Sequence, residues 1–278
     1  MRASRKHATG TRQRCISAIK RSFSLCVLFF GASLSAQEHA NKLRVCAEPN
    51  NFPVSDRAGG GFENRIAQLV ADDLGLELVT TWHPYWRGFV RKTLGAHRCD
   101  VLIGVPSDFD RVLTTQPYYR SHYVFVTPEG AEPVRGFDDP RLKSERVGLQ
   151  MIANDVTTTP PGFALAPNGP RPNLIGFSVY EERPAAAQIA EAVAKGDVAV
   201  GVLWGPQAGY YVENGRGLQL NPAVAPPYAA MLPFEYGISM GVRKGDIALQ
   251  ALLSGVIERR RADIEQILDE YGVPRAGR

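Results

Sequence analysis

The segment from residue 43 to residue 105 reads LRVCAEPNNFPVSDRAGGGFENRIAQLVADDLGLELVTTWHPYWRGFVRKTLGAHRCDVLIGV, and its alternating patterns decide the fold. Short apolar runs predict strands at 43–47, 76–82 and 100–105. Apolar residues at helical spacing predict a helix that ends at Gly75 and a second that carries Phe89 and Leu94 and ends at Gly95. Strand, helix, strand, helix, strand with short connections predicts a parallel sheet with right-handed crossovers.

The rest of the chain continues this alternation of strands and helices, and the elements after the strand at 120–127 form a second group. Strands are expected at 120–127, 147–150, 174–179, 198–204 and 236–242, and helices at 184–195 and in two segments near the C-terminus. Residues 145–222 therefore resemble a second, smaller α/β unit. The fold class predicted for the whole chain is α/β.

The charge of the chain is distributed unevenly. The 278 residues carry a formal net charge of +4, but residues 1–36 contain seven Lys or Arg and no acid, which leaves 25 basic and 28 acidic residues in the remainder. This basic segment contains an apolar run at residues 23–34, which is typical of a secretory signal peptide and too short to cross a membrane; an uncleaved anchor is the alternative. The mature protein is then slightly acidic, which argues against nucleic acid or an acidic membrane as its partner.

Two cysteines, Cys46 and Cys99, remain after removal of residues 1–36. An even pair in an exported protein favours a disulfide, and the alternative is two buried free thiols. In one common doubly wound order the first and third strands are neighbours, which brings these two residues close. No His lies at ligand spacing from either cysteine, so no metal site is expected.

Several stretches carry a resemblance to a known family. The segments LRVCAEPNNFP, GGGFENRIAQLVADDLG and RCDVLIGVPSDFDRVLTTQPYYRSHYVFV resemble bacterial periplasmic solute-binding proteins of family 3, the amino-acid-receptor type. PNNFP, RGFVRKTL, CDVLIGVP, LTTQPYYRS and ILDEYGVPR resemble the MxaJ/XoxJ branch of that family, whose members are associated with quinoprotein methanol dehydrogenase and methylotrophy. The resemblance spans nearly all of residues 41–274.

The resemblance implies a periplasmic binding protein type II fold, with two α/β lobes joined by two hinge crossings. Lobe one is then expected at 41–127 plus 228–278, and lobe two at 128–227. The ligand cleft is expected between the lobes, at the carboxyl ends of the strands.

The charged groups that hold an amino acid in this family are missing. The family's carboxylate-binding Arg lies about nine residues before a Pro-Tyr pair, and here that count reaches Asp108. The family's ammonium-binding Asp lies six residues before a Tyr, and here that count reaches Trp204. An α-amino acid is therefore not the expected ligand, because its charges are left unpaired in a desolvated cleft.

Aromatic residues at or near predicted strand ends replace these anchors and suggest a cleft for an apolar ligand or a segment of another protein. For each single aromatic residue, packing in the core is the alternative. The candidate cleft residues are Glu48, Phe52, Trp82, Trp86, Arg87, Tyr118, Tyr119, Arg120 and Trp204.

Sequence motifs of catalysis are absent: the chain contains no GxSxG, HExxH, GxxxxGK[ST] or GxGxxG. No catalytic residue and no cofactor are expected, and the protein is not expected to be an enzyme. A dehydratase-like reaction with Glu48 or Asp108 as the general base is the alternative.

Two functions compete on these observations. The first is a periplasmic accessory protein that binds a PQQ-dependent methanol or alcohol dehydrogenase during its maturation or activation. The second is the substrate-binding protein of an ABC importer for a small solute that is not an amino acid. Both place the working protein in the periplasm, with a small-molecule ligand in the cleft under the second function.

Overall fold

The computed structural model describes residues 41–85, 87–152, 155–169 and 171–277. The described residues from Leu43 onwards form one compact unit. The predicted signal peptide, residues 1–36, lies outside the described residues.

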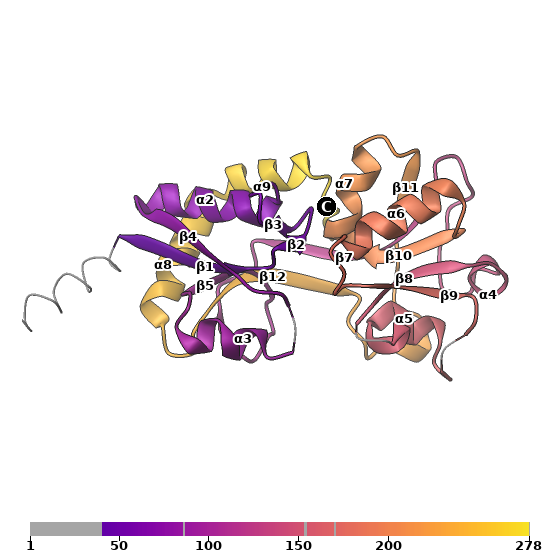
Figure 1. The fold of residues 1–278 in the computed structure, drawn as a ribbon, viewed down its shortest axis with the longest axis horizontal. Coiled ribbons are helices and arrows are strands. Elements are labelled where there is room, and N and C mark those ends of the chain that lie inside the picture. The colour runs from indigo at the N-terminus through magenta and orange to yellow at the C-terminus, as the bar shows by residue number, and fades with distance from the viewer. Residues whose placement is uncertain (1–40, 86, 153–154, 170, 278) are drawn as a thin grey trace, which may run out of the picture. The chain divides into compact units, whose positions relative to one another are not determined.

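One mixed sheet forms the centre of this unit, with strand order β4-β1-β5-β12-β7-β10-β8-β9, while β11 pairs with β7 and β6 with β12 (Figure 1). The strands are β1 (Lys42–Ala47), β4 (Glu77–Trp82), β5 (Val101–Pro106), β6 (Leu113–Thr114), β7 (Tyr119–Pro128), β8 (Val147–Met151), β9 (Leu174–Ser178), β10 (Val200–Trp204), β11 (Leu218–Pro222) and β12 (Glu235–Val242). Two short strands, β2 (Asn50–Asn51) and β3 (Ser55–Asp56), form a separate pair. The first and third predicted strands are parallel neighbours, as expected, with Val45 opposite Val101.

Helices connect the strands and cover the sheet, which confirms the α/β class. They are α2 (Phe62–Leu74), α3 (Phe89–Lys92), α4 (Arg141–Ser144), α5 (Pro160–Leu165), α6 (Ala185–Lys195), α7 (Gly205–Glu213), α8 (Ile247–Arg259) and α9 (Arg261–Glu270). Three single turns of 3₁₀ helix lie at Leu94–Ala96, Val156–Thr158 and Pro227–Ala229. Gly75 ends α2 in the left-handed conformation that its position requires, with φ 65°.

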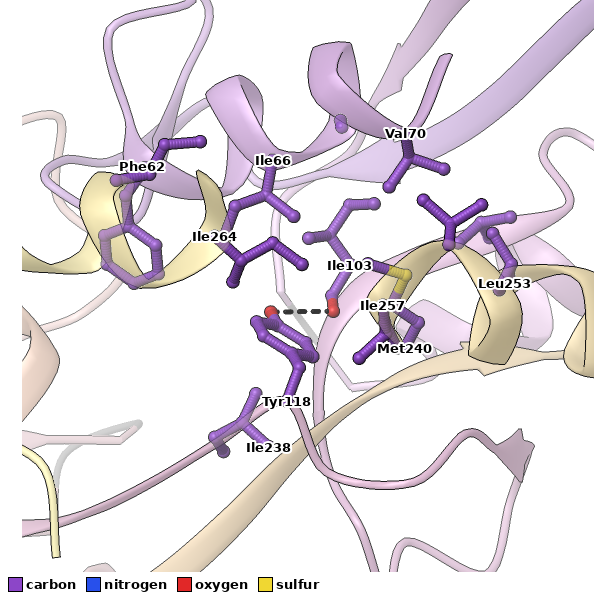
Figure 2. Close-up of a cluster of buried hydrophobic side chains, with 14 of the residues drawn as sticks. Phe62, Ile66, Val70, Ile103, Tyr118, Ile238, Met240, Leu253, Ile257 and Ile264 are labelled. Atoms are coloured by element: carbon purple, nitrogen blue, oxygen red, sulfur yellow. Dashed lines mark hydrogen bonds between the residues drawn. The ribbon is translucent and has the colours of Figure 1, made fainter. Parts of the chain in front are cut away.

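The largest hydrophobic core lies between α2, α8, α9 and the β1, β5 and β12 strands (Figure 2). Ile66 from α2 and Ile264 from α9 contact this core, and α2 and α9 run side by side in Figure 1. Alternate residues of a strand point to opposite faces, so Val101 and Ile103 join this core while Leu102 joins a smaller cluster on the other face.

A second part of the sheet, made of β7, β8, β9 and β10, has its own cores on both faces. Phe125, Leu149 and Val202 pack with residues of α4 and α5, and the alternate residues Val124 and Val126 pack with α6 and α7. Each of the two parts of the sheet is therefore buried against hydrophobic cores of its own. The lobe boundaries that the resemblance implies remain a prediction.

The predicted disulfide is present between Cys46 in β1 and Cys99, which lies two residues before β5. The Cα atoms of the two residues are 5.5 Å apart, across 53 residues of sequence. The parallel pairing of β1 and β5 places them together, as the strand order predicts.

The structure differs from the sequence prediction in four helices, of which α4 and α5 are short and lie in segments where no helix was predicted. The helix predicted through Phe89 and Leu94 is a four-residue α3 followed by a 3₁₀ turn. Thr93 lies at the junction and leaves the helical conformation (φ −115°, ψ −87°), and its hydroxyl donates to the Phe89 carbonyl (2.7 Å). Helix α7 was not predicted, since its two glycines lower helix propensity. Gly209 is required there because a Cβ would collide with the Gly272 carbonyl.

Candidate functional site

A cavity of about 540 Å³ opens where several parallel strands end. Glu48 directly follows β1, Pro106 is the last residue of β5, and Trp204 is the last residue of β10. Ile152 and Val179 directly follow β8 and β9 and also line the cavity. Ligands of open α/β sheets bind at the carboxyl ends of strands, so this cavity is the candidate functional site.

Aromatic side chains form much of the cavity wall: Tyr85, Tyr119, Tyr123, Tyr180, Trp204 and Tyr236. Three of them form a continuous stack of edge contacts, with ring centroids 5.3 Å apart for Tyr123 and Trp204 and 5.5 Å apart for Trp204 and Tyr236. Burial raises the pKa of Tyr123 far above its usual range, so its hydroxyl stays neutral. These aromatic side chains form an uncharged part of the cavity wall.

The charged residues that line the cavity are all acidic: Glu48, Glu63, Glu181 and Glu182. Of the lining residues that the structure describes, none is Lys, Arg or His. Glu181 and Glu182 are exposed, so water screens their charges. Glu48 and Glu63 lie deeper and determine the electrostatic character of the site.

Glu63 is a buried acid, with 7% of its surface exposed. Among the described residues, no donor bonds to its carboxyl group and no basic side chain pairs with it. Desolvation raises the pKa of Glu63 to about 8. The position of Glu63 in the first turn of α2 acts in the opposite direction, because a helix N-terminus favours an anion. That effect is typically about 0.3–1 kcal/mol, less than one pKa unit, so desolvation dominates.

The space for the Glu63 side chain is provided by Gly104, which lies in β5 and also lines the cavity. A Cβ atom on Gly104 would collide with Oε1 of Glu63 and lie 2.8 Å from its Cδ. The glycine is required here for a close approach, and it lets the carboxyl group reach the cavity.

Glu48 fixes the loop that follows β4. Its carboxylate accepts hydrogen bonds from the backbone N–H groups of Tyr85 and of Asn50, the latter at 3.4 Å. Desolvation raises the pKa of Glu48, while these two hydrogen bonds and the charge of His83 act to lower it. Unlike Glu63, Glu48 therefore already has partners within the protein.

Three side-chain amides that line the cavity are joined by hydrogen bonds. The Gln150 amide donates to the Gln207 carbonyl oxygen (2.8 Å), and the Gln207 amide donates to Oδ1 of Asn51 (2.7 Å). All three residues line the cavity and come from segments more than 50 residues apart in sequence. These hydrogen bonds connect β2 with α7 and β8.

Three of the residues predicted for the cleft line this cavity: Glu48, Tyr119 and Trp204. Trp204 stands where the family's ammonium-binding Asp is expected, and it contributes an aromatic edge instead. Trp86 lies outside the described residues. Arg87 is exposed and is not part of the lining. A binding role for all of these residues remains a prediction.

The other predicted residues lie outside the cavity lining. Phe52 packs edge-on against Tyr210, with ring centroids 4.7 Å apart. The guanidinium group of Arg57 lies 5.8 Å from the ring centroid of Trp82. The remaining two have partners elsewhere: the Tyr118 hydroxyl donates to the Ile103 carbonyl (3.0 Å; Figure 2), and Arg120 forms an exposed ion pair with Glu235 (2.8 Å).

Sequence reasoning missed several lining residues, among them Glu63, Gln150 and Gln207. A signal for Glu63 was present, because it lies on the same helical face as Ile66 and Val70, which are buried. An acid on the apolar face of an amphipathic helix is unusual and indicates a specific environment. The two glutamines carry no comparable signal.

Within the described ranges, no group of three or more His, Cys, Asp or Glu side chains is arranged to hold a metal ion. A search of the same residues for a helix long and apolar enough to cross a membrane also finds none.

Comparisons with known proteins identify the family, although no family model matches the chain. Protein MoxJ of Methylorubrum extorquens is 35% identical over 261 residues, which cover 87% of this chain and 84% of MoxJ. The crystal structure of periplasmic binding protein XoxJ from Methylobacterium extorquens is 36% identical, covers 85% of this chain and 100% of that chain, and superposes with a TM-score of 0.66.

A third neighbour shows the wider fold family. An ancestral cationic amino acid solute-binding protein superposes with a TM-score of 0.65, covers 86% of this chain and 99% of its own, and is 17% identical, a level that establishes the fold alone. A second structure of that protein describes it as a precursor of cyclohexadienyl dehydratase. Three findings agree: the parallel strands end at one cavity, the disulfide is present, and the sequence identity extends over most of both chains. This chain therefore has the type II periplasmic binding protein fold and belongs to the MoxJ/XoxJ/MxaJ family.

Proposed function

We propose that this protein is a periplasmic accessory protein that binds a PQQ-dependent methanol or alcohol dehydrogenase during its maturation or activation. Membership of the MoxJ/XoxJ/MxaJ family supports this function, because the sequence resemblance to that branch implies a quinoprotein dehydrogenase partner. The protein acts by binding and not as an enzyme, and residues 1–36 are its signal peptide. The disulfide fits the oxidising periplasm.

The observation that carries the proposal is the apolar rim of the cavity. We use this name for four lining residues with large exposed fractions: Tyr85 (41%), Ile152 (40%), Val179 (39%) and Tyr180 (41%). Exposed apolar side chains gathered at one opening are typical of interaction sites, and Tyr is enriched among the residues that dominate protein binding. A partner segment that covers the rim removes these side chains from water.

The proposed division into lobe one (41–127 plus 228–278) and lobe two (128–227) assigns the rim to both lobes. Tyr85 belongs to lobe one, while Ile152, Val179 and Tyr180 belong to lobe two. A partner that contacts the rim therefore contacts both lobes at once.

Binding between the purified mature protein and the dehydrogenase, with and without PQQ, tests the proposal. We expect the double variant Tyr85→Ser/Tyr180→Ser to bind at least about 10-fold more weakly, because one central aromatic residue contributes about 2 kcal/mol or more. Met231→Ser is the matched control, since Met231 is 98% exposed and does not line the cavity. If neither form of the dehydrogenase associates with the native chain, the proposal is wrong.

A receptor that delivers a small solute, other than an amino acid, to an ABC importer is the second candidate. The cavity volume of about 540 Å³ favours it, because small-molecule pockets typically measure about 300–1,000 Å³. A purified permease complex whose ATPase activity rises on addition of the loaded protein would support this candidate against the first.

A further inference from the structure

We infer that the cavity binds a small organic cation, a primary or quaternary ammonium ion that carries no carboxylate, with Glu63 as the group that neutralises its charge. The inference concerns the interior of the cavity and does not depend on the dehydrogenase partner. Three features of the described residues carry it: the unpaired buried acid, the sign of the lining charges, and the aromatic wall.

The first feature is the Glu63 carboxyl group. It is more than nine-tenths buried, it lines the cavity, and none of the described side chains or backbone N–H groups pairs with it. A buried acid without a partner is destabilising, and such groups are normally paired. Gly104 leaves the space that directs this group to the cavity. A bound cation would supply the missing partner.

The second feature is the sign of the charges. Four glutamates line the cavity, and the described part of its wall has no basic residue. A ligand carboxylate would face only these acids, with no guanidinium to bind it. Arg120, which the sequence predicted for the cleft, forms an ion pair with Glu235 outside the lining. The site therefore selects a cation and rejects both anions and amino acids.

The third feature is the composition of the wall around Glu63. Tyr85 and Tyr119 lie near this carboxyl group, and for the buried Tyr119 desolvation and the negative charge of Glu63 raise the pKa above its usual range. Both rings line the cavity, and aromatic rings attract cations by cation–π interaction. A metal ion requires several oxygen ligands, and the described residues contain no cluster of three acidic or imidazole groups. An organic cation fits this wall better.

Thermal unfolding of the mature protein with three probes of equal chain length tests the inference: n-butylammonium, n-butanol and butyrate, at constant ionic strength and pH 8. We expect n-butylammonium alone to raise the melting temperature, as mass action requires of a ligand that binds the folded state. Glu63→Gln should weaken this binding by about 10- to 100-fold, the range for loss of one hydrogen bond to a charged group. Glu77→Gln, an exposed acid in β4, is the matched control and should leave it unchanged.

A second measurement uses tetramethylammonium, whose charge does not depend on pH. Its affinity should increase between pH 6 and pH 8, because the cation selects the ionised form of Glu63, and this increase should be smaller in Glu63→Gln. Glu48 faces the same cavity and His83 acts on Glu48, so a residual pH dependence in the variant belongs to these groups.

Three results would overturn the inference: no response to either cation at millimolar concentration, an equal response to butyrate, or unchanged binding in Glu63→Gln. Loss of dehydrogenase binding with intact cation binding would contradict only the proposed function. The opposite result would contradict only this inference.

Discussion

Replacing Glu63 by Gln should change how the stability of the protein depends on pH. In the folded state desolvation raises the pKa of this carboxyl group from 4.5 to about 8, while in the unfolded chain it titrates near the ordinary value. Between these two values the folded protein holds a proton that the unfolded chain has released. The free energy of unfolding therefore decreases as the pH rises through this window. Gln cannot ionise, so the variant lacks this contribution.

The size of the effect follows from the gap between the two pKa values. One pKa unit corresponds to about 1.36 kcal/mol, so the folded state loses at most about 5 kcal/mol above pH 8 and about 3 kcal/mol at pH 7. The helix N-terminus offsets about 0.3–1 kcal/mol of this cost. At pH 5 the folded carboxyl group is neutral and resembles the amide of Gln, so the two proteins should be similarly stable.

Urea unfolding of the native mature protein, Glu63→Gln and the control Glu77→Gln at pH 5, 7 and 9, without added cations, measures this difference. We expect Glu63→Gln to become more stable than the native protein as the pH rises, by up to about 4 kcal/mol at pH 9. Glu77→Gln should follow the native profile, since Glu77 is exposed. Parallel profiles for the native protein and Glu63→Gln, or a variant less stable at pH 9, would refute this account of Glu63.

Two further predictions concern the structure around the site. Gly104→Ala should destabilise the protein by about 1–3 kcal/mol in urea at pH 5, because its Cβ collides with Glu63, and Glu63→Ala in the same chain should recover part of this loss; equal costs with and without Glu63→Ala would contradict the collision. Cys46→Ala/Cys99→Ala should lose about 4 kcal/mol, the chain-entropy value for a loop of this length, and a reducing agent should lower the melting temperature of the native protein but not of the variant.

Much of the fold could be predicted from local patterns. The predicted strands agree with β1, β4, β5, β7, β8, β9, β10 and β12, because apolar runs between turn residues depend on sequence neighbours. The pairing of Cys46 with Cys99 followed from the parallel order of two strands and is confirmed. The α7 helix could not be predicted, since its glycines are explained only by contacts with residues far away in sequence: Gly209 lies against Gly272, and Gly205 lies against His122 and Pro274.

The candidate site was predicted less completely. Position at a strand end identified Glu48, Tyr119 and Trp204 as lining residues, but the same rule also selected Phe52 and Trp82, which pack elsewhere. Position at a strand end predicts where a residue lies along the sheet, but it does not predict the direction in which the side chain points. That direction depends on neighbouring segments that the local sequence does not contain.

The sequence by itself determined the class of fold, the order of its elements, the family and the disulfide. Only the tertiary structure decided which side chains surround the cavity and what charge it presents. Glu63, Gln150 and Gln207 come from distant parts of the chain, and their shared environment exists only after the strands have paired. Burial decides the state of Glu63, because the cost of its charge depends on the water that folding removes and on the partners that folding brings near.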